Sequence, residues 1–192
     1  MKFKKEVIFA LMVLIIVSLA CGSSSNGVSV EESSASEGEV VSEPEEEPTK
    51  EVGTARSNPA PVGSAITADN MKFQIIGSTR PANDIIMSGN MFNTEPEEGE
   101  EYILIELQIE CMKDKDDTCN IYQSSFKLIG DEGVTYDAEW FVSGVDGLLE
   151  SEEFYGEGLV AGSLPFIIKD IDMDLIFLYE PFLGDKFYMS VE

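Results

Sequence analysis

Residues 101–111 constrain the fold most strongly, because their apolar side chains recur at every second position. The segment reads EYILIELQIEC, and its other face carries Glu106, Gln108 and Glu110. Successive side chains of a β-strand point to opposite faces of a sheet, whereas a helical pattern repeats about every 3.6 residues. The segment therefore predicts a long strand with one buried face. That face consists of Ile103, Ile105, Leu107, Ile109 and Cys111.

Shorter strand-like runs follow the same logic over the second two thirds of the chain. Gly- and Asp-rich turns separate them, and no segment shows a sustained helical period. The runs are 71–77, 125–130, 134–139, 159–168, 175–181 and 186–191. Many short strands with regular turns predict an all-β fold, in which two antiparallel sheets pack as a β-sandwich of seven to eight strands.

The N-terminus has the composition of an export signal. Lys2, Lys4 and Lys5 precede an apolar run over residues 7–20, and Cys21 follows it directly. A membrane-spanning helix needs roughly 20 apolar residues, so this run is short for one. The segment resembles the lipobox of bacterial lipoproteins, although Ser18 and Leu19 depart from the usual residue order. That resemblance implies cleavage before Cys21, acylation of its thiol and an extracytoplasmic, membrane-anchored protein; ordinary secretion and an uncleaved anchor are the alternatives.

Residues 21–61 read as a linker between this anchor and a folded domain. Beyond Cys21 the segment is rich in Ser, Glu and Pro and contains no aromatic residue. Such a composition buries too little apolar area to offset the entropy of ordering the chain, so we expect disorder. The predicted organisation is a signal peptide over 1–20, a linker over 21–61 and a β-sandwich over 62–192.

The motifs within residues 62–192 also occur in a characteristic order. The stretches are EEGEEYILIELQI, SSFKLIGDEGVTYDAE and GEGLVAGSLPFII, followed by LIFLYEP. In this order they resemble a family of exported bacterial lipoproteins with an immunoglobulin-like domain of unknown function, similar to secreted immunoprotective antigens. The resemblance implies an immunoglobulin-like fold and an exported location, and it implies no activity. It is carried by Gly99, Tyr102, Phe126, Leu128, Gly133, Tyr136, Gly158, Gly162 and Phe166.

Charge and composition exclude several function classes. The net charge is −25, and residues 62–192 alone carry 27 acidic and seven basic side chains. So negative a surface repels phosphate backbones, which excludes nucleic-acid binding. The chain has no histidine, so it cannot build a Ser-His-Asp or Cys-His catalytic arrangement. It also lacks a nucleophile motif and a Gly-rich phosphate loop, and we expect a non-catalytic protein without a cofactor.

Cys111 and Cys119 lie at the two ends of the segment MKDKDDT, between one predicted strand and the next. In an oxidising compartment outside the cytoplasm, such a pair is expected to form a disulfide that closes a hairpin. Two unpaired thiols are the alternative.

Two acidic loops have side chains of the type that bind calcium. Asp114, Asp116 and Asp117 lie on the loop between the cysteines, and Asp170, Asp172 and Asp174 lie further along the chain. Neither loop has the glycine and glutamate positions of an EF-hand. A looser calcium site, serving a calcium-dependent adhesion or envelope module, is one hypothesis, and solvated turns are the other.

Two further loops are more apolar than solvated turns should be. In 81–93 and 139–155, large apolar residues either fold back to cap the sandwich or form a surface for a protein partner of the envelope or the medium. The candidates for partner binding are Ile85, Ile86, Met91, Phe92, Trp140, Phe141, Leu148 and Leu149.

Overall fold

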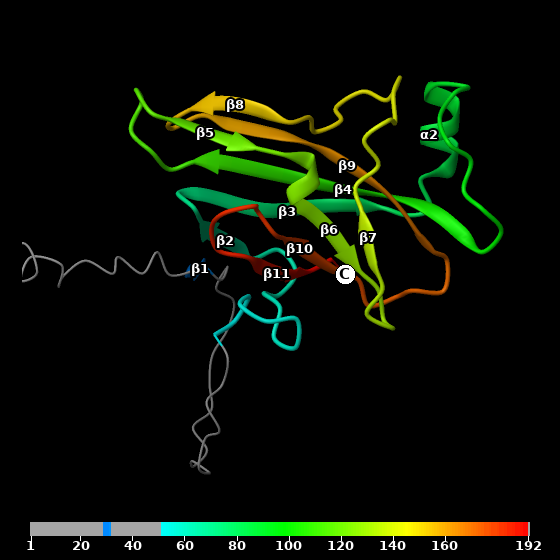
Figure 1. Cartoon of the computed structure of the whole chain (residues 1–192), viewed down its shortest axis with the longest axis horizontal. Helices are drawn as coiled ribbons and strands as arrows, with labels where there is room; N and C mark the ends of the chain where they lie inside the picture. Colours follow the sequence, from blue (N-terminus) through cyan, green and yellow to red (C-terminus); the bar gives the residue numbers. More distant parts are fainter. Residues whose placement is uncertain (1–28, 32–50, 192) are drawn as a thin grey trace, which may run out of the picture.

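The computed structural model describes residues 29–31 and 51–191, which form eleven strands and one α-helix (Figure 1). One sheet contains β1 (Ser29–Glu31), β2 (Ala65–Ala68), β3 (Met71–Thr79), β4 (Glu100–Cys111) and β9 (Leu159–Lys169), in that order. The other contains β11 (Phe187–Ser190), β10 (Ile176–Tyr179), β6 (Phe126–Ile129) and β7 (Thr135–Asp137). A two-stranded ribbon joins β5 (Thr118–Ile121) to β8 (Glu152–Tyr155), and every pairing between named strands is antiparallel.

The antiparallel β-sandwich predicted from the sequence is confirmed, and each predicted strand run contains an observed strand. The strand number is higher than the expected seven to eight, because β1, β2, β5 and β8 lie outside the runs that the sequence predicted as strands. The helix α2 (Asn83–Gly89) was also missed, since seven residues barely complete two turns of a 3.6-residue period.

The longest strand, β4, organises the five-stranded sheet. It pairs with β9 from Glu100↔Lys169 to Glu110↔Leu159, and with β3 along its other edge. Its predicted apolar face lies in the main core between the sheets, where Ile103, Ile105, Leu107, Ile109 and Cys111 are fully buried. The alternation read from the sequence therefore identified the inner face of this strand correctly.

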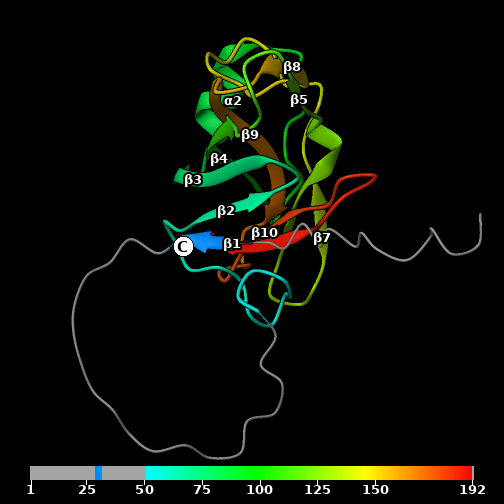
Figure 2. The same cartoon turned by 90° about the vertical axis from the view of Figure 1, so that its left-hand side faces the viewer.

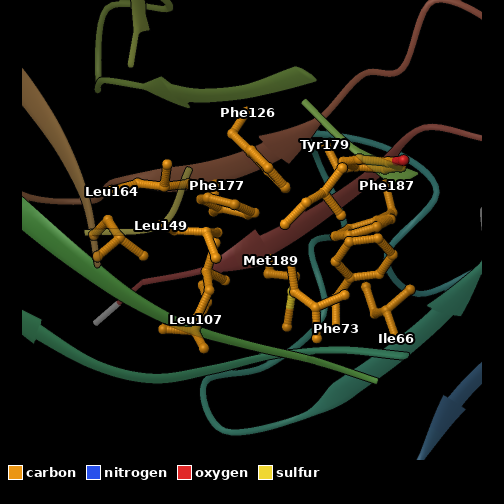
Figure 3. Packing of buried hydrophobic residues seen from close by; sticks show 14 of the residues in the cluster. Ile66, Phe73, Leu107, Phe126, Leu149, Leu164, Phe177, Tyr179, Phe187 and Met189 are labelled. Atoms are coloured by element: carbon orange, nitrogen blue, oxygen red, sulfur yellow. The ribbon is translucent and has the colours of Figure 1, made fainter. Parts of the chain in front are cut away.

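Aromatic side chains from both sheets fill one part of the core. Phe73 of β3 contacts Tyr179 of β10 and Phe187 of β11, with ring centroids 4.7 and 5.0 Å apart. Phe126 of β6 lies 5.5 Å from Tyr179, and Figure 3 shows these rings packed together. Since Phe73 belongs to one sheet and the other rings belong to the second, this cluster joins the two sheets. Tilted ring pairs of this kind stabilise the interface beyond the effect of buried area alone.

The folded domain begins earlier than residue 62, where the sequence placed its boundary. Ala60 is fully buried, and its amide donates to the carbonyl oxygen of Tyr188 at 2.8 Å. Gly53 accepts a hydrogen bond from the Tyr188 amide, also at 2.8 Å. Gly53 and Ala60 thus attach this segment to β11, and β1, which lies inside the predicted linker, pairs with β2 of the folded domain. Backbone hydrogen bonding by small residues leaves no periodic pattern, so composition alone missed this part.

We predict that Phe73→Ala lowers the free energy of unfolding by about 3–5 kcal/mol, because it removes the ring shared by both sheets and leaves a cavity. Denaturant unfolding followed by circular dichroism measures the change. The matched control is Phe182→Ala, whose ring is 97% exposed, and which should change stability by no more than about 0.5 kcal/mol. A similar loss in both variants would contradict the assignment of the core.

Candidate partner-binding surface

The two apolar loops predicted as partner-binding elements lie against each other. Figure 1 shows α2 beside the connection between β7 and β8, and Figure 2 shows the same neighbours in the turned view. The two backbones touch at Gly89 and Gly144: a Cβ atom on Gly144 would lie 2.2 Å from the Gly89 carbonyl oxygen. Gly144 also has a φ of +73°. Both the close approach and the left-handed backbone require glycine at this position.

Asn93 holds the two loops together. This buried side chain donates to the Ser143 carbonyl oxygen at 3.0 Å and accepts from the Ser143 amide at 3.0 Å. It also donates to the carbonyl oxygen of Ile86 at 2.6 Å. One amide group therefore joins α2, the segment after it and the opposite loop, and it satisfies backbone groups that would otherwise be costly to bury.

Asn90 fixes the exposed part of the first loop. Its side chain donates to Ser143 Oγ at 2.7 Å and accepts from the amide of Phe92 at 3.0 Å. The second loop is fixed where it leaves the sheet, because the Glu139 amide donates to the Pro165 carbonyl oxygen of β9 at 2.8 Å. The Phe92 amide is thus itself hydrogen-bonded, and Trp140 follows directly after a hydrogen-bonded backbone position.

Five of the eight predicted partner-binding residues are exposed on these loops. Phe92 and Phe141 are 85% and 91% exposed, and Met91 is 82% exposed. Trp140 is more than half exposed, and Ile85 somewhat less. We call Ile85, Met91, Phe92, Trp140 and Phe141 the two-loop surface. Single exposed apolar residues are ordinary, but several large ones on two loops clamped together are typical of an interaction site.

The other three residues point inward, so their assignment to partner binding is corrected. Ile86 is fully buried with Ala82, Tyr102 and Leu104, on the face of β4 that points away from the sandwich core. Leu148 is half-buried against this second cluster. Leu149 is buried in the main core. Its amide donates to the Ser163 carbonyl oxygen of β9, which holds the side chain there.

Polar groups lie beside the second cluster. Tyr102 donates its hydroxyl to the Thr94 carbonyl oxygen at 2.9 Å, and its amide donates to Asn83 Oδ1 at 2.7 Å. Burial raises the pKa of Tyr102, with a further contribution from the charge of Glu139. Burial also raises the pKa of Glu139, and the charges of Asp137 and Glu100 add to that shift. The support of the two-loop surface is therefore apolar inside and acidic at its edge.

The disulfide prediction is confirmed. Cys111 at the end of β4 and Cys119 on β5 form a bond, with Cα atoms 5.8 Å apart. Both residues are buried in the main core, so the bridge attaches the β5–β8 ribbon to the five-stranded sheet.

The acidic residues considered as calcium ligands do not form a cluster. Asp114, Asp116 and Asp117 are exposed on the turn between β4 and β5, where the Asp117 amide donates to the Asp114 carbonyl oxygen at 2.9 Å. Within residues 29–31 and 51–191, no three side chains of the metal-binding types lie close enough to hold an ion. The calcium hypothesis gains no support from this arrangement.

The second acidic loop forms hydrogen bonds within the protein. Asp172 is buried and accepts from the Tyr136 hydroxyl at 2.5 Å. Burial, and then this hydrogen bond, raise the pKa of Tyr136 to about 12. The guanidinium of Arg80 donates to the carbonyl oxygens of Asp170 and Asp172 and forms an ion pair with Glu101 at 2.5 Å. These groups fasten the turn between β9 and β10 to the sheet.

A pocket on the opposite end of the molecule had no counterpart in the predictions. It has a volume of about 820 Å³, and the connection between β10 and β11 lines one side. Phe182 is 97% exposed there, and Leu183 is also largely exposed. Two large apolar residues within the turn PFLGD were the available signal in the sequence. Tyr179 and Asp69 also line the pocket, but no pattern in the sequence indicated them. Tyr179 is an ordinary residue of a strand, and Asp69 is an ordinary residue of a turn.

Comparison with known proteins identifies the fold and no activity. No family model matches the chain, and no curated protein matches it significantly. The yjhA protein from Bacillus subtilis has a similar structure, with a TM-score of 0.51 and 14% identity over 69% of this chain and 99% of that one. This similarity supports the fold alone.

Two weaker structural matches have TM-scores below 0.5. A putative lipoprotein, ycdA, from Bacillus subtilis has a TM-score of 0.48 and 12% identity, covering 66% of this chain and 38% of that one. The secreted protein MPT63 from Mycobacterium tuberculosis has a TM-score of 0.46 and 8% identity, covering 66% and 83%. In the described part of the chain, no helix has the length and apolar character to cross a bilayer. Cys21 and the predicted signal lie outside the described residues.

We predict that reducing the Cys111–Cys119 bond lowers the free energy of unfolding by about 2.5 kcal/mol, because the unfolded chain regains the entropy of its closed loop. Urea unfolding with and without reductant measures the effect. The double variant Cys111→Ala, Cys119→Ala is the control and should not respond to reductant. Unchanged stability after complete reduction, verified by mass, would show that the ribbon needs no covalent attachment.

Proposed function

We propose that this protein is a lipid-anchored, extracytoplasmic binding module without catalytic activity, and that its two-loop surface contacts a protein partner. The observation that carries the proposal is the exposure of Met91, Phe92, Trp140 and Phe141 on loops that Asn93 holds in place. Aromatic and methionine side chains contribute disproportionately to binding energy at protein interfaces.

The rigidity of the surface favours this function over a structural one. The side chains that stabilise the loops, Ile86, Leu149 and Asn93, are buried. The exposed side chains of the two-loop surface add little to that packing, so they contribute little to the stability of the domain. A surface arranged before binding loses less conformational entropy when a partner docks.

Charge indicates the chemistry of the partner surface. The chain carries −25 overall, and acidic side chains such as Asp84 and Asp146 lie on the same two loops. We therefore expect a partner with an apolar groove surrounded by basic residues, because opposite charges around an interface accelerate association and orient it.

The location is inferred from the N-terminal sequence. Three lysines, a short apolar run and Cys21 have the order of a lipoprotein signal. Two or more acyl chains attach a protein to a bilayer far more firmly than one, so lipidation at this residue would make the module a stable membrane protein.

We predict that Phe92→Ala and Phe141→Ala each weaken partner capture about tenfold or more, as expected for hot-spot residues. The measurement is photo-crosslinking from residue 91 in intact cells, followed by titration of the captured protein with each variant. Phe182→Ala is the matched control, because it removes an equally exposed ring at the other end of the molecule.

Equal affinity of all three variants would overturn the proposed surface. Crosslinking to lipid in place of protein would show that the two-loop surface contacts the membrane. Circular dichroism of each variant separates a loss of binding from a loss of fold.

We also predict that Cys21→Ser abolishes incorporation of labelled fatty acid and releases the protein from the membrane fraction, because the thiol that accepts the acyl chain is gone. Cys111→Ser should leave the label unchanged. Membrane retention and intact mass without acyl groups in the parent protein would contradict lipidation.

A further inference from the structure

The pocket at the end opposite the two-loop surface has the size and lining of a small-molecule site. Its volume is about 820 Å³, within the usual range for ligand pockets of about 300–1,000 Å³. It is lined by residues of the turn between β2 and β3 and of the connection between β10 and β11, two backbone segments that Figure 1 shows on the side of the molecule away from α2. Its lining includes the apolar side chains of Phe182 and Leu183 and the ring of Tyr122, together with the polar residues Asp69, Tyr179 and Glu180.

Asp69 is the unusual group in this pocket. Its Oδ2 atom is buried and has no hydrogen-bond partner, a condition shared by no other side-chain oxygen or nitrogen in the described residues. Its Oδ1 atom accepts one long hydrogen bond, 3.4 Å from the Asp185 amide. Burial raises the pKa of Asp69; the hydrogen bond from the Asp185 amide opposes this shift, and the charge of Asp185 adds to it. A buried acceptor without a donor costs about 1–3 kcal/mol, so the site gains energy when a donor arrives.

The nearby charged side chains already have partners. Lys113 Nζ donates to the Thr118 carbonyl oxygen at 2.7 Å. Glu180 forms ion pairs with Lys127 at 3.3 Å and with Lys186 at 3.8 Å. No ion pair to Asp69 occurs within residues 51–191. Its carboxyl group is therefore the uncompensated acid of the pocket.

The aromatic lining suits a positive charge as well as an apolar body. Tyr179 and Asp69 both line the pocket. Burial raises the pKa of Tyr179 and the charge of Asp69 adds to the shift, which keeps the phenol neutral. Tyr122 and Phe182 present exposed rings at the pocket. Ring faces attract organic cations, and an acidic domain raises their local concentration.

The connection between β10 and β11 covers Asp69. A Cβ atom on Gly184 would lie 2.2 Å from Asp69 Oδ2, and Gly184 has a φ of +127°. The backbone of this connection thus lies directly on the carboxyl group, while Phe182 next to it faces solvent. A ligand group therefore reaches Oδ2 only when this exposed turn moves away from it.

We propose that this pocket binds a small organic amine, whose primary ammonium group donates to Asp69 and whose apolar body lies against Tyr122 and Phe182. Hydrogen donors are required to satisfy the buried oxygen, so a trimethylammonium group is a poor substitute. Charge is also required, so a neutral alcohol of the same shape is poorer still.

The test is calorimetric titration of the full chain with phenethylamine, its N,N,N-trimethyl derivative and 2-phenylethanol. We expect phenethylamine to bind about tenfold or more tightly than either analogue. Asp69→Asn should weaken phenethylamine binding by a similar factor. Asp146→Asn is the matched control, because it removes the same charge from an exposed position in the two-loop region and should change affinity less than about twofold.

Phe182→Ala supplies a second variant, which we expect to fold normally because its ring is almost fully exposed, and it should weaken binding several-fold. Equal affinity for the three probes, equal affinity of Asp69→Asn and Asp146→Asn, or no binding by phenethylamine would each overturn the proposal. The result is independent of partner capture, which depends on Phe92 and Phe141 at the other end.

Discussion

Burial of both faces of β4 over residues 102–105 is the constraint on which the rest of the structure depends. One face, with Ile103 and Ile105, lies between the sheets, and the other, with Tyr102 and Leu104, is covered by α2 and the loop before β8. A strand in this position cannot leave its outer face to solvent without exposing large apolar side chains. The loops that cover it are therefore structural on their inner side.

This covering arrangement explains why the same loops suit recognition. Ile86 and Asn93 hold the loops against the sheet, whereas Phe92 and Phe141 on the same loops are exposed to solvent. Binding residues on loops are most effective where a rigid scaffold positions them. At the other end, the pocket near Asp69 is bounded by the turn between β10 and β11, so the two proposed sites use separate connections and need not interfere.

The sequence was most informative where a regular pattern extended over many residues. Alternation over 101–111 identified the inner face of β4, and the spacing of Cys111 and Cys119 predicted their disulfide. It was least informative for short elements. The helix α2 and the strand β8 lie inside segments expected to be loops, and the packing of Ala60 along β11 depends on hydrogen bonds rather than on side-chain pattern. The sequence identified eight apolar loop residues as candidates for partner binding, but the structure buries two of them, Ile86 and Leu149.

The sequence by itself determined the β-sandwich class, the acidity of the surface and the segments in which recognition was to be sought, because these follow from local periodicity and composition. Tertiary structure alone decided which side chains of each loop face outward, and it brought Asn93 to Ser143 and Asp69 under Gly184. These pairs are 50 or more residues apart in the chain. Their contacts arise from how the sheets pack, and no local pattern encodes such a distance.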